Sequence, residues 1–554
     1  MTTRISMKLN YKRTILVGFA FFIICMFWQA YDTTIPLILT NKFGMSQAWS
    51  GAIMALDNVL ALFLLPFFGA LSDKCTAKRG KRTPFILVGT LLAVVFFVGL
   101  SLFDARQLTM LDDVTPDKYQ ESLSIIYDAN PSIPVPEAAD SDGMSLTEAL
   151  AHLVAPERKQ ALQDVFPEKQ QFLQITMYAT DSDGAPTSVV NQAYTDYVIP
   201  ARNAYAWQRT VESPLTLVFF ILLLLAVLVS MGIFRSPAVA LMPDVTPKPM
   251  RSKANAIINL MGSFGGITVL VLGMIFKTGD AKNALMSYLP FFVTVAALML
   301  VGLVVFLLTV REKAWAAEAE AVDGDRDVER KQEAGKSVHP NGETAVQGGE
   351  GHLSPAERRS LIFILLSVAL WYMGYNAVTS KYSVYAGQVL NMDYNLTLII
   401  AQAAAILSYI PIGVISSRVG RKKAILAGVI ILSVSFGTAS FMRADSPILL
   451  MNILFALAGI GWATINVNSY PMVVEMAHGG RIGKYTGYYY TASMAAQVLT
   501  PILSGILLDI RFTSLFPYAT VFVVLAFVTM LFVRHGDSKP PVHDSLIEHI
   551  GTED

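Results

Sequence analysis

Long apolar stretches separated by short polar segments recur along most of the chain. A helix rises 1.5 Å per residue, so roughly 20 apolar residues span the hydrocarbon core of a bilayer. Twelve stretches are close to this length or longer, at residues 14–40, 48–71, 84–103, 214–241, 254–276, 286–310, 360–380, 396–417, 424–442, 447–470, 484–508 and 515–533. The pattern predicts an all-α membrane protein with twelve transmembrane helices.

Composition supports a membrane protein and excludes several other classes. The 554 residues are 53% hydrophobic and only 15% charged, with a mean hydropathy of +0.49, well beyond ordinary globular composition. The net charge is zero and no basic stripe carries interleaved aromatic residues, so we expect no nucleic-acid partner. The two cysteines, Cys25 and Cys75, lack metal-ligand spacing, so we expect no metal site.

Lysine and arginine are distributed unequally between the two sets of loops. If the N-terminus is cytoplasmic, the cytoplasmic segments hold 28 of these residues, and the short outer loops hold six. The positive-inside rule therefore predicts that both termini are cytoplasmic, and we expect the protein in the plasma membrane. The first apolar stretch is longer than a signal peptide and is expected to be retained as a helix.

A basic loop after the second apolar stretch has a counterpart in the second half of the chain. The loop at residues 69–85 reads GALSDKCTAKRGKRTPF, and residues 413–425 read GVISSRVGRKKAI. A second pair of inner segments matches as well, since each places an acid six or seven residues before an arginine: Asp244 before Arg251, and Glu475 before Arg481. Two six-helix halves with matching loops indicate parallel repeats.

The doubled loop resembles the signature loop of the major facilitator superfamily. More narrowly, GALSDKCTAKRGKRTPFILVGT at residues 69–90 is similar to the proton-coupled sucrose and maltose transporters, which are related to the glycoside, pentoside and hexuronide cation symporters. The resemblance implies sugar transport by alternating access. Sodium-coupled relatives carry an acid close to the proline of the second helix, but Leu65 precedes Pro66 here, which favours protons. Ser417 stands where the second copy of the loop would carry aspartate.

The charges of these inner loops are candidates for gating. An aspartate at the end of a helix can hold the cytoplasmic side closed through charge-assisted contacts with arginine. The alternative is that the loop charges only fix the topology, which is the expected role of the loop lysines. The gating candidates are Asp73, Arg82, Asp244, Arg251, Arg421, Glu475 and Arg481.

Three ionisable residues lie inside predicted membrane helices, where charge is costly and usually functional. Counted from the inner ends, Asp32 and Asp57 lie roughly 24–28 Å up and Arg235 about 13 Å up, nearer the cytoplasm. We expect these three residues to couple transport to protons. Alternatively, Asp32 is a solvated residue at the outer mouth, Asp57 belongs to a structural buried pair, and Arg235 pairs with one of the acids.

A sugar site needs amides and hydroxyls for the ring hydroxyls, and aromatic faces for the apolar side of the ring. Each such residue could instead bond helices together or pack in the core. The candidates are Gln29, Asn58, Asn259, Trp371, Tyr375, Asn376, Gln402, Asn466 and Asn468.

Two polar segments interrupt the helices. Residues 104–213 are predicted to lie outside the cell and carry 17 acidic against seven basic residues. Ser145–Glu148 matches a capping box and Pro156 begins a second predicted helix, so we expect a small folded module that serves as a lid, a docking surface or inert decoration. The predicted domains are 1–103, the insert 104–213, 214–310, a linker 311–358 that is part helix and part disordered, 359–534 and a tail 535–554.

The chain lacks the motifs of common enzymes. The linker sequence EAGKS has Arg330 where a phosphate-binding loop requires glycine, and no nucleophile elbow or zinc-protease motif occurs. We therefore predict a non-enzymatic, monomeric transporter that takes up a disaccharide or related glycoside with protons and needs no other cofactor. A partner for the insert at 104–213 stays open, and the sequence does not identify it. A proton-coupled efflux antiporter and a non-transporting sugar sensor remain alternatives.

Overall fold

The computed structural model describes residues 9–115, 118–135, 158–180, 186–247, 250–323, 354–476 and 482–536. Among these residues, eleven helices are long and apolar enough to cross a membrane, and Tyr394–Tyr409 is a shorter apolar stretch within α14. These twelve helices confirm the predicted all-α membrane fold of two six-helix halves.

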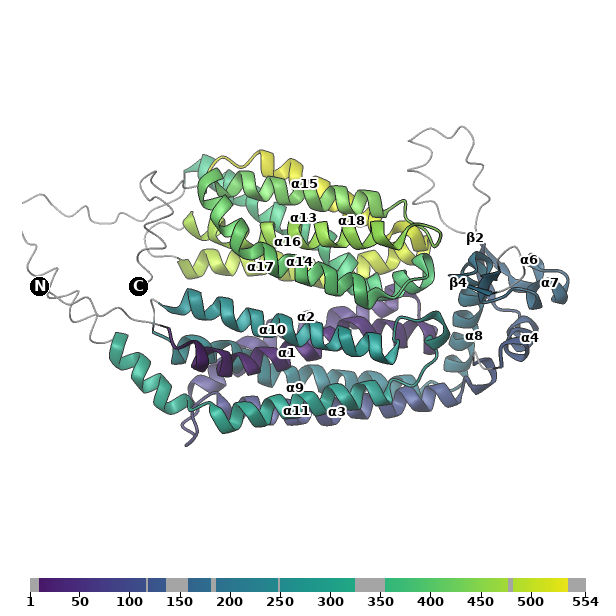
Figure 1. Ribbon diagram of the computed structural model, residues 1–554, viewed down its shortest axis with the longest axis horizontal. Helices are drawn as coiled ribbons and strands as arrows, with labels where there is room; N and C mark the ends of the chain where they lie inside the picture. Colours follow the sequence, from purple (N-terminus) through teal and green to yellow (C-terminus); the bar gives the residue numbers. More distant parts are fainter. Residues whose placement is uncertain are drawn as a thin grey trace, which may run out of the picture.

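Each half packs around its own apolar core, and Figure 1 shows the two halves side by side. The most extensive contacts between them join α2 to α17, α10 to α14 and α1 to α13. The N-terminal half contains α1 (Tyr11–Leu37), α2 (Gln47–Asp73), α3 (Thr83–Thr109), α9 (Leu215–Val245), α10 (Arg251–Phe276) and α11 (Leu289–Thr309). The C-terminal half contains α13 (Pro355–Tyr385), α14 (Tyr394–Val419), α15 (Arg421–Ala439), α16 (Ile448–Glu475), α17 (Ile482–Ile510) and α18 (Leu515–Leu531).

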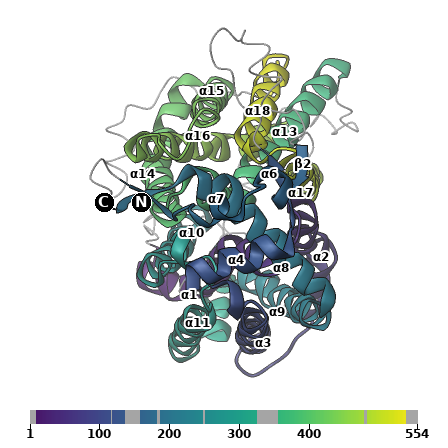
Figure 2. The same cartoon turned by 90° about the vertical axis from the view of Figure 1, so that its right-hand side faces the viewer.

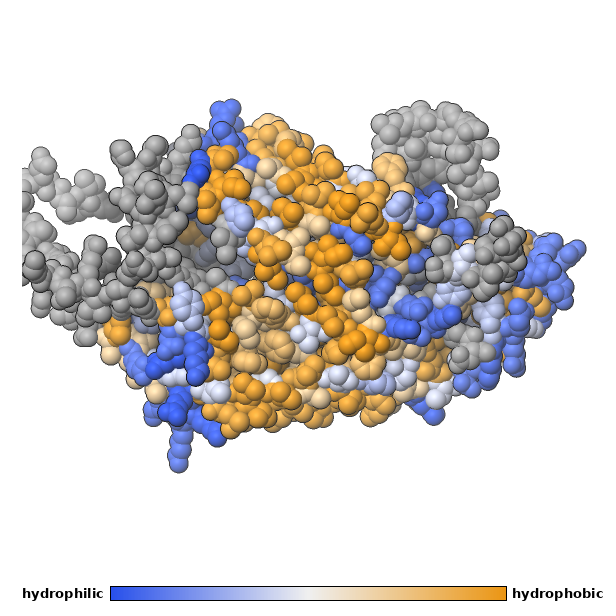
Figure 3. All heavy atoms as spheres, in the orientation of Figure 1, coloured by the Kyte–Doolittle hydropathy of each residue, from blue (hydrophilic) through white to orange (hydrophobic). Residues whose placement is uncertain are grey.

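The surface of the bundle carries a broad apolar belt between two polar ends (Figure 3). The start of α1 and the end of α18 lie at one polar end, which we call the terminal end (Figure 1). The segment between α3 and α9 covers the opposite end, which we call the insert end. A belt of exposed apolar side chains with polar ends is the surface that a bilayer stabilises.

Two helices continue past their predicted outer ends as π-helical turns. α1 runs into η1 (Ile38–Lys42), and α13 runs into η7 (Ala386–Leu390). Lys42 and Lys381, which the loop count placed outside the membrane, are therefore fully buried at helix ends. Because buried polar groups need partners, each of these lysines is held by specific contacts, described below.

The insert is a small folded module, as predicted. Its apolar core includes Leu123, Ile126, Ile133, Leu162 and Phe172. The predicted helices at residues 145–148 and 156 lie outside the described residues. The elements of the insert are η2 (Asp112–Val114), α4 (Tyr119–Ala129), β1 (Ser132–Val135), β2 (Arg158–Ala161), α6 (Leu162–Val165), α7 (Lys169–Leu173), β3 (Tyr178–Thr180), β4 (Pro186–Val190), η4 (Tyr194–Val198) and α8 (Ile199–Glu212).

Two antiparallel strand pairs, β1 with β2 and β3 with β4, complete the module, with Ser132 opposite Ala161 and Tyr178 opposite Val190. Seen from the insert end, the module lies across the ends of both halves (Figure 2). Short 3-10 turns, η6 (Ala281–Asn283) and η8 (Phe512–Ser514), lie in two further loops. On the terminal side, residues 312–323 of the linker are helical, and the linker's residues 324–353 lie outside the described part of the chain.

Candidate functional site

The three ionisable residues predicted inside the membrane line a single cavity. Asp32 of α1, Asp57 of α2 and Arg235 of α9 border a volume of 200 Å³. The two halves both contribute, because Asn376, Thr379 and Ser380 of α13 and Gln497 and Pro501 of α17 line the same cavity. The structure thus places the two acids and the arginine around one cavity between the halves.

Local contacts hold two of these side chains. Asp57 Oδ1 accepts hydrogen bonds from the backbone N–H of Asn58, at 2.6 Å, and from its side-chain amide, at 2.7 Å. The guanidinium carbon of Arg235 lies 5.3 Å from the centre of the Trp28 ring, a cation–π contact. Arg235 was predicted nearer the cytoplasm. Counting residues gives only the height of its Cα atom, whereas its guanidinium lies several ångströms from that atom and lines the same cavity as the acids.

A second cavity of 1010 Å³ adjoins the first, because Trp28 and Asp32 line both. Four of the predicted sugar contacts border it: Gln29, Asn259, Gln402 and Asn466. Gln402 Nε2 donates a hydrogen bond to Gln29 Oε1 at 2.6 Å and so joins the two halves across the cavity. Two further predicted contacts, Asn58 and Asn376, border the smaller cavity.

The remaining predicted sugar contacts are not among the residues that line these cavities. Trp371 is 0% exposed in the core of the C-terminal half. Asn468 is buried as well and donates to the backbone carbonyl of Thr464 at 2.9 Å. Tyr375 stacks face to face on Trp462, with ring centres 3.7 Å apart. These three residues pack within one half, the structural role that the sequence left open.

Several cavity residues were missed by the sequence reasoning. Thr379 and Ser380 follow Asn376 by three and four residues, the spacing that puts side chains on one face of a helix. That spacing was a usable signal. Gln497 and Tyr409 carried no comparable signal, because neither has another polar cavity residue three or four positions away on its helix.

The candidate gating residues of the N-terminal half form one network at the terminal end. The Arg82 guanidinium contacts Asp73 and Ser72, and its Nε donates to Asp244 Oδ2 at 2.8 Å. Lys81 Nζ lies 3.2 Å from the same Asp244 oxygen. This network joins α2, α3 and α9, which all belong to one half. It is formed in a structure whose insert end is closed, as the contacts below show.

Further contacts extend this network to the linker. Glu312, at the start of the linker helix, accepts from the backbone N–H groups of Arg82 and Thr83, both at 2.8 Å. Arg251 donates to the backbone carbonyl of Pro243 at 2.8 Å. In the C-terminal half Arg421 pairs with Glu475. Arg481 lies outside the described residues.

At the insert end, direct contacts close the space between the halves. Asp509 of α17 accepts from the backbone N–H groups of Gln47, at 2.6 Å, and Ala48, at 2.8 Å, at the start of α2. Lys381 Nζ of α13 donates to the Gln47 carbonyl at 2.7 Å. A Cβ atom on Gly51 would come 1.8 Å from the Pro501 carbonyl, so only glycine permits this approach of α2 and α17.

A second pair of helices closes the other side of the same end. Thr278, just beyond α10, shares a 2.7 Å hydrogen bond with the Tyr394 hydroxyl of α14, and Asn395 Nδ2 donates to Thr278 at 3.2 Å. A Cβ atom on Gly273 would come 2.3 Å from Asn395 Oδ1. The structure is therefore closed at the insert end.

Comparison with known families identifies the fold. The model of the Major Facilitator Superfamily matches residues 205–408 and 394–550, and a model described as MFS/sugar transport protein matches residues 16–104. The chain belongs to the Major Facilitator Superfamily. This confirms the family to which the doubled loop pointed.

Individual relatives match over short stretches. The sucrose transport protein SUC3 of Arabidopsis thaliana is 43% identical over 68 residues, 12% of this chain and 11% of the relative. The human proton-associated sugar transporter A is 34% identical over 91 residues, 16% of this chain and 12% of the relative. An MFS-type transporter of Methanocaldococcus jannaschii is 30% identical over 125 residues, 22% of this chain and 30% of the relative. The matches thus span less than a third of each of these relatives.

Solved structures match over nearly the whole chain at low identity. The inward-open xylose transporter XylE from E. coli has a TM-score of 0.53 at 14% identity, with 96% of this chain and 97% of the other covered. A D-xylose-proton symporter has a TM-score of 0.53 at 13% identity, with 95% and 99% covered. These likenesses establish the superfamily fold.

Proposed function

We propose that this superfamily member is a secondary active transporter that takes up a disaccharide or related glycoside together with protons. The observation that carries the proposal is the meeting of Asp32, Asp57 and Arg235 in one cavity that both halves line. An adjoining cavity of 1010 Å³, bordered by amides and a tyrosine, has room for such a sugar. Relatives that are named for sucrose and for proton-associated sugar transport support both parts of the proposal.

The orientation proposed here places the terminal end in the cytoplasm and the insert outside the cell, in the plasma membrane. The positive-inside asymmetry supports this orientation. Burial of Lys42 and Lys381 strengthens the asymmetry, because two of the six outer charges are not exposed on the outer surface. With this orientation, the conformation described above is closed to the outside.

In the proposed cycle, the acids take up a proton while the cavity faces outward. A carboxyl group shielded from water holds a proton more readily than one in water. While Asp57 is ionised, its charge attracts the Arg235 guanidinium in the shared cavity. Once Asp57 is protonated, the fork of N–H donors on Arg235 is available to the sugar hydroxyls. Proton and sugar therefore favour each other's binding, which is the requirement for symport.

Proton movement in sealed proteoliposomes tests this proposal. Sucrose, maltose and other glycosides are added outside, and the internal pH is recorded. We expect one sugar to drive proton entry and Asp57→Asn to abolish it. Asp445→Asn, at an exposed position in a loop of the insert end, serves as the matched control and should leave proton entry unchanged. Sugar uptake that remains fully dependent on the pH gradient in Asp32→Asn and Asp57→Asn would remove both acids from the coupling role.

The same measurement separates the alternatives. Apolar residues such as Leu260, Ile406 and Val467 also border the larger cavity, a lining that an efflux antiporter for apolar molecules would use. In that case protons move opposite to the substrate. A sugar that binds but is not transported, and that drives no proton movement, would instead indicate a sensor.

A further inference from the structure

Hydrogen bonds and apolar contacts join the insert to the N-terminal half. Gln107 of α3 donates to Thr210 of α8 at 3.0 Å and to the Lys42 carbonyl at 3.1 Å. Leu285, from the loop before α11, is part of the apolar core of the insert. The insert is therefore expected to move together with the N-terminal half.

The insert also reaches the C-terminal half. Thr195 Oγ1 donates to Asn391 Oδ1 at 2.9 Å, and Asn391 Nδ2 donates to Thr195 Oγ1 at 2.7 Å. Asn391 follows η7 in the left-handed backbone conformation, with φ of 50°, so its position is set by the end of that turn. Because the insert belongs to the other half, these bonds must break when the halves separate at the insert end.

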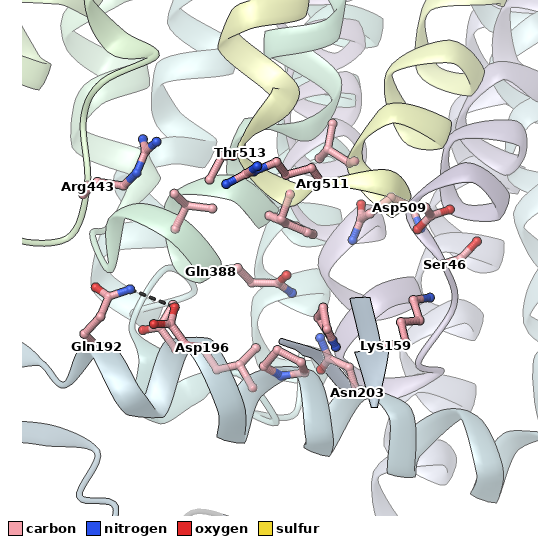
Figure 4. A pocket seen from close by; sticks show the side chains of 18 of the residues that line it. Ser46, Lys159, Gln192, Asp196, Asn203, Gln388, Arg443, Asp509, Arg511 and Thr513 are labelled. Carbon is pink, nitrogen blue, oxygen red and sulfur yellow. Dashed lines mark hydrogen bonds between the residues drawn. The ribbon is translucent and has the colours of Figure 1, made fainter. Parts of the chain in front are cut away.

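A pocket of 510 Å³ lies beside this contact, between the insert and the ends of the membrane helices (Figure 4). We call it the outer pocket. Asn203 and Asp196 approach it from the insert, and Ser46, Arg511 and Thr513 approach it from the two halves. Three separate parts of the chain build it, so it is complete only while the insert end is closed.

The lining of the outer pocket suits a neutral molecule with many hydroxyl groups. Two buried oxygen atoms in it, Asn203 Oδ1 and Thr513 Oγ1, have no hydrogen-bond partner among the described residues. Buried polar atoms normally have partners, so each of these atoms would gain one when its side chain turns toward a ligand in the pocket. The side chains of Gln192 and Gln388 add amides, and Phe512 adds an aromatic ring.

Charge in the outer pocket is nearly balanced. Lys159, Arg443 and Arg511 face two acids, Asp196 and Asp509, and Asp509 is already engaged by the start of α2. A strongly anionic or cationic ligand would meet one set of like charges. The volume lies within the roughly 300–1,000 Å³ usual for small-molecule sites. A neutral sugar fits this balance and this size.

We propose that the outer pocket binds a neutral sugar from the extracellular side and thereby stabilises the conformation closed to the outside. The choice of a sugar rests on the proposed function, whereas the state dependence follows from the three-part lining. A ligand that binds only the closed arrangement shifts the equilibrium toward it. High external sugar should therefore slow its own uptake.

The first test measures initial uptake in proteoliposomes over a wide range of external sugar concentration. As the external sugar concentration increases, the initial uptake rate of the native protein should first rise and then fall. Asn203→Ala and Thr513→Val remove atoms without internal partners, so they should preserve the fold and the rise. Since a hydrogen bond contributes about 1 kcal/mol, each should raise the inhibitory concentration about fivefold. Gln208→Ala, exposed on the same helix as Asn203, is the matched control. A saturating curve without a fall overturns the proposal, as does a fall that neither pocket variant alters.

A second test does not depend on transport. Cys25 borders the 1010 Å³ cavity, so its modification by an impermeant thiol reagent from the terminal side reports the inward-facing conformation. In inside-out vesicles of Cys75→Ser protein, sucrose and maltose in the lumen reach only the insert end. We expect luminal sugar to speed modification of Cys25, and Asn203→Ala to remove the effect.

The two tests distinguish failure of this proposal from failure of the proposed function. If uptake is normal but luminal sugar leaves Cys25 modification unchanged, the outer pocket does not bind sugar, while the transport proposal stands. If no sugar is transported, but luminal sugar still speeds Cys25 modification in the native protein and not in Asn203→Ala, the outer-pocket proposal holds and the transport proposal fails. Equal acceleration in the native protein and Asn203→Ala assigns the effect to the central cavity and overturns the outer pocket.

Discussion

Asp509→Ala should make the insert end open more often. Asp509 joins the halves by accepting from two backbone N–H groups, those of Gln47 and Ala48. These N–H groups begin α2, where the helix dipole adds to the attraction for a carboxylate. When the halves separate, water can bond both the carboxylate and the N–H groups. The substitution therefore weakens the closed conformation and leaves the open one almost unaffected.

The magnitude follows from the number and kind of bonds. A hydrogen bond to a charged group contributes roughly 1.5–3 kcal/mol. Asp509 is only partly buried, so we take about 2 kcal/mol for both bonds together. Since 1.4 kcal/mol corresponds to a tenfold change in an equilibrium constant, the population of the open conformation should rise about 30-fold.

A cysteine at position 278 measures this population. Thr278 is 4% exposed and bonds Tyr394 across the gate, so a cysteine there reacts with an impermeant reagent from the insert side only during opening. In a Cys25→Ser, Cys75→Ser background, Asp509→Ala should speed this reaction about 30-fold. Asp445→Ala is the control from the same half. A rate within twofold of the control in well-folded Asp509→Ala protein would refute the reasoning.

Three further predictions concern stability and closure. Lys42→Met alone leaves Asp104 buried without its 2.5 Å partner and should destabilise the protein by roughly 3–5 kcal/mol, while Lys42→Met with Asp104→Leu should recover most of the loss in thermal unfolding. Gly505→Ala places a Cβ atom 2.3 Å from the Gln47 carbonyl, so it should prevent outer closure and abolish uptake, with a normal elution profile in gel filtration. Burial raises the pKa of Asp196, so its protonated form favours folding, and stability falls as pH rises through its ordinary value of roughly 4. Asp196→Asn should therefore raise the melting temperature at pH 7.5 relative to the native protein, and change it little at pH 3.

The helices could be predicted from sequence because hydropathy depends on length and composition alone. The stretch at 48–71 became α2 (Gln47–Asp73), and 515–533 became α18 (Leu515–Leu531). The ends of the helices were harder to predict, because a lysine at a helix end looks the same in the sequence whether it is buried or exposed. Lys381 was therefore counted with the outer loop, although it lies inside α13 and bonds the opposite half.

The site could be predicted only in part for a similar reason. A charge within an apolar stretch is conspicuous, so Asp32, Asp57 and Arg235 were found. A tryptophan in an apolar helix is not, and the sequence could not tell that Trp28 faces the cavities whereas Trp371 faces the core. That distinction depends on the rotation of each helix, which is set by its packing partners.

The distribution of strong and weak contacts fits a protein that must switch between conformations. The fully buried pair Lys42–Asp104 lies within one half, where it need not break. Across the gate, the buried Lys381 bonds a backbone carbonyl at 2.7 Å, and Thr195 and Asn391 bond as neutral groups. Breaking a buried ion pair at each cycle would cost several kcal/mol and would populate one conformation almost completely. These bonds between the halves pair neutral groups, or one charged group with the backbone, and none of them joins two opposite charges. The two conformations therefore stay close enough in free energy for a proton or a sugar to shift the balance.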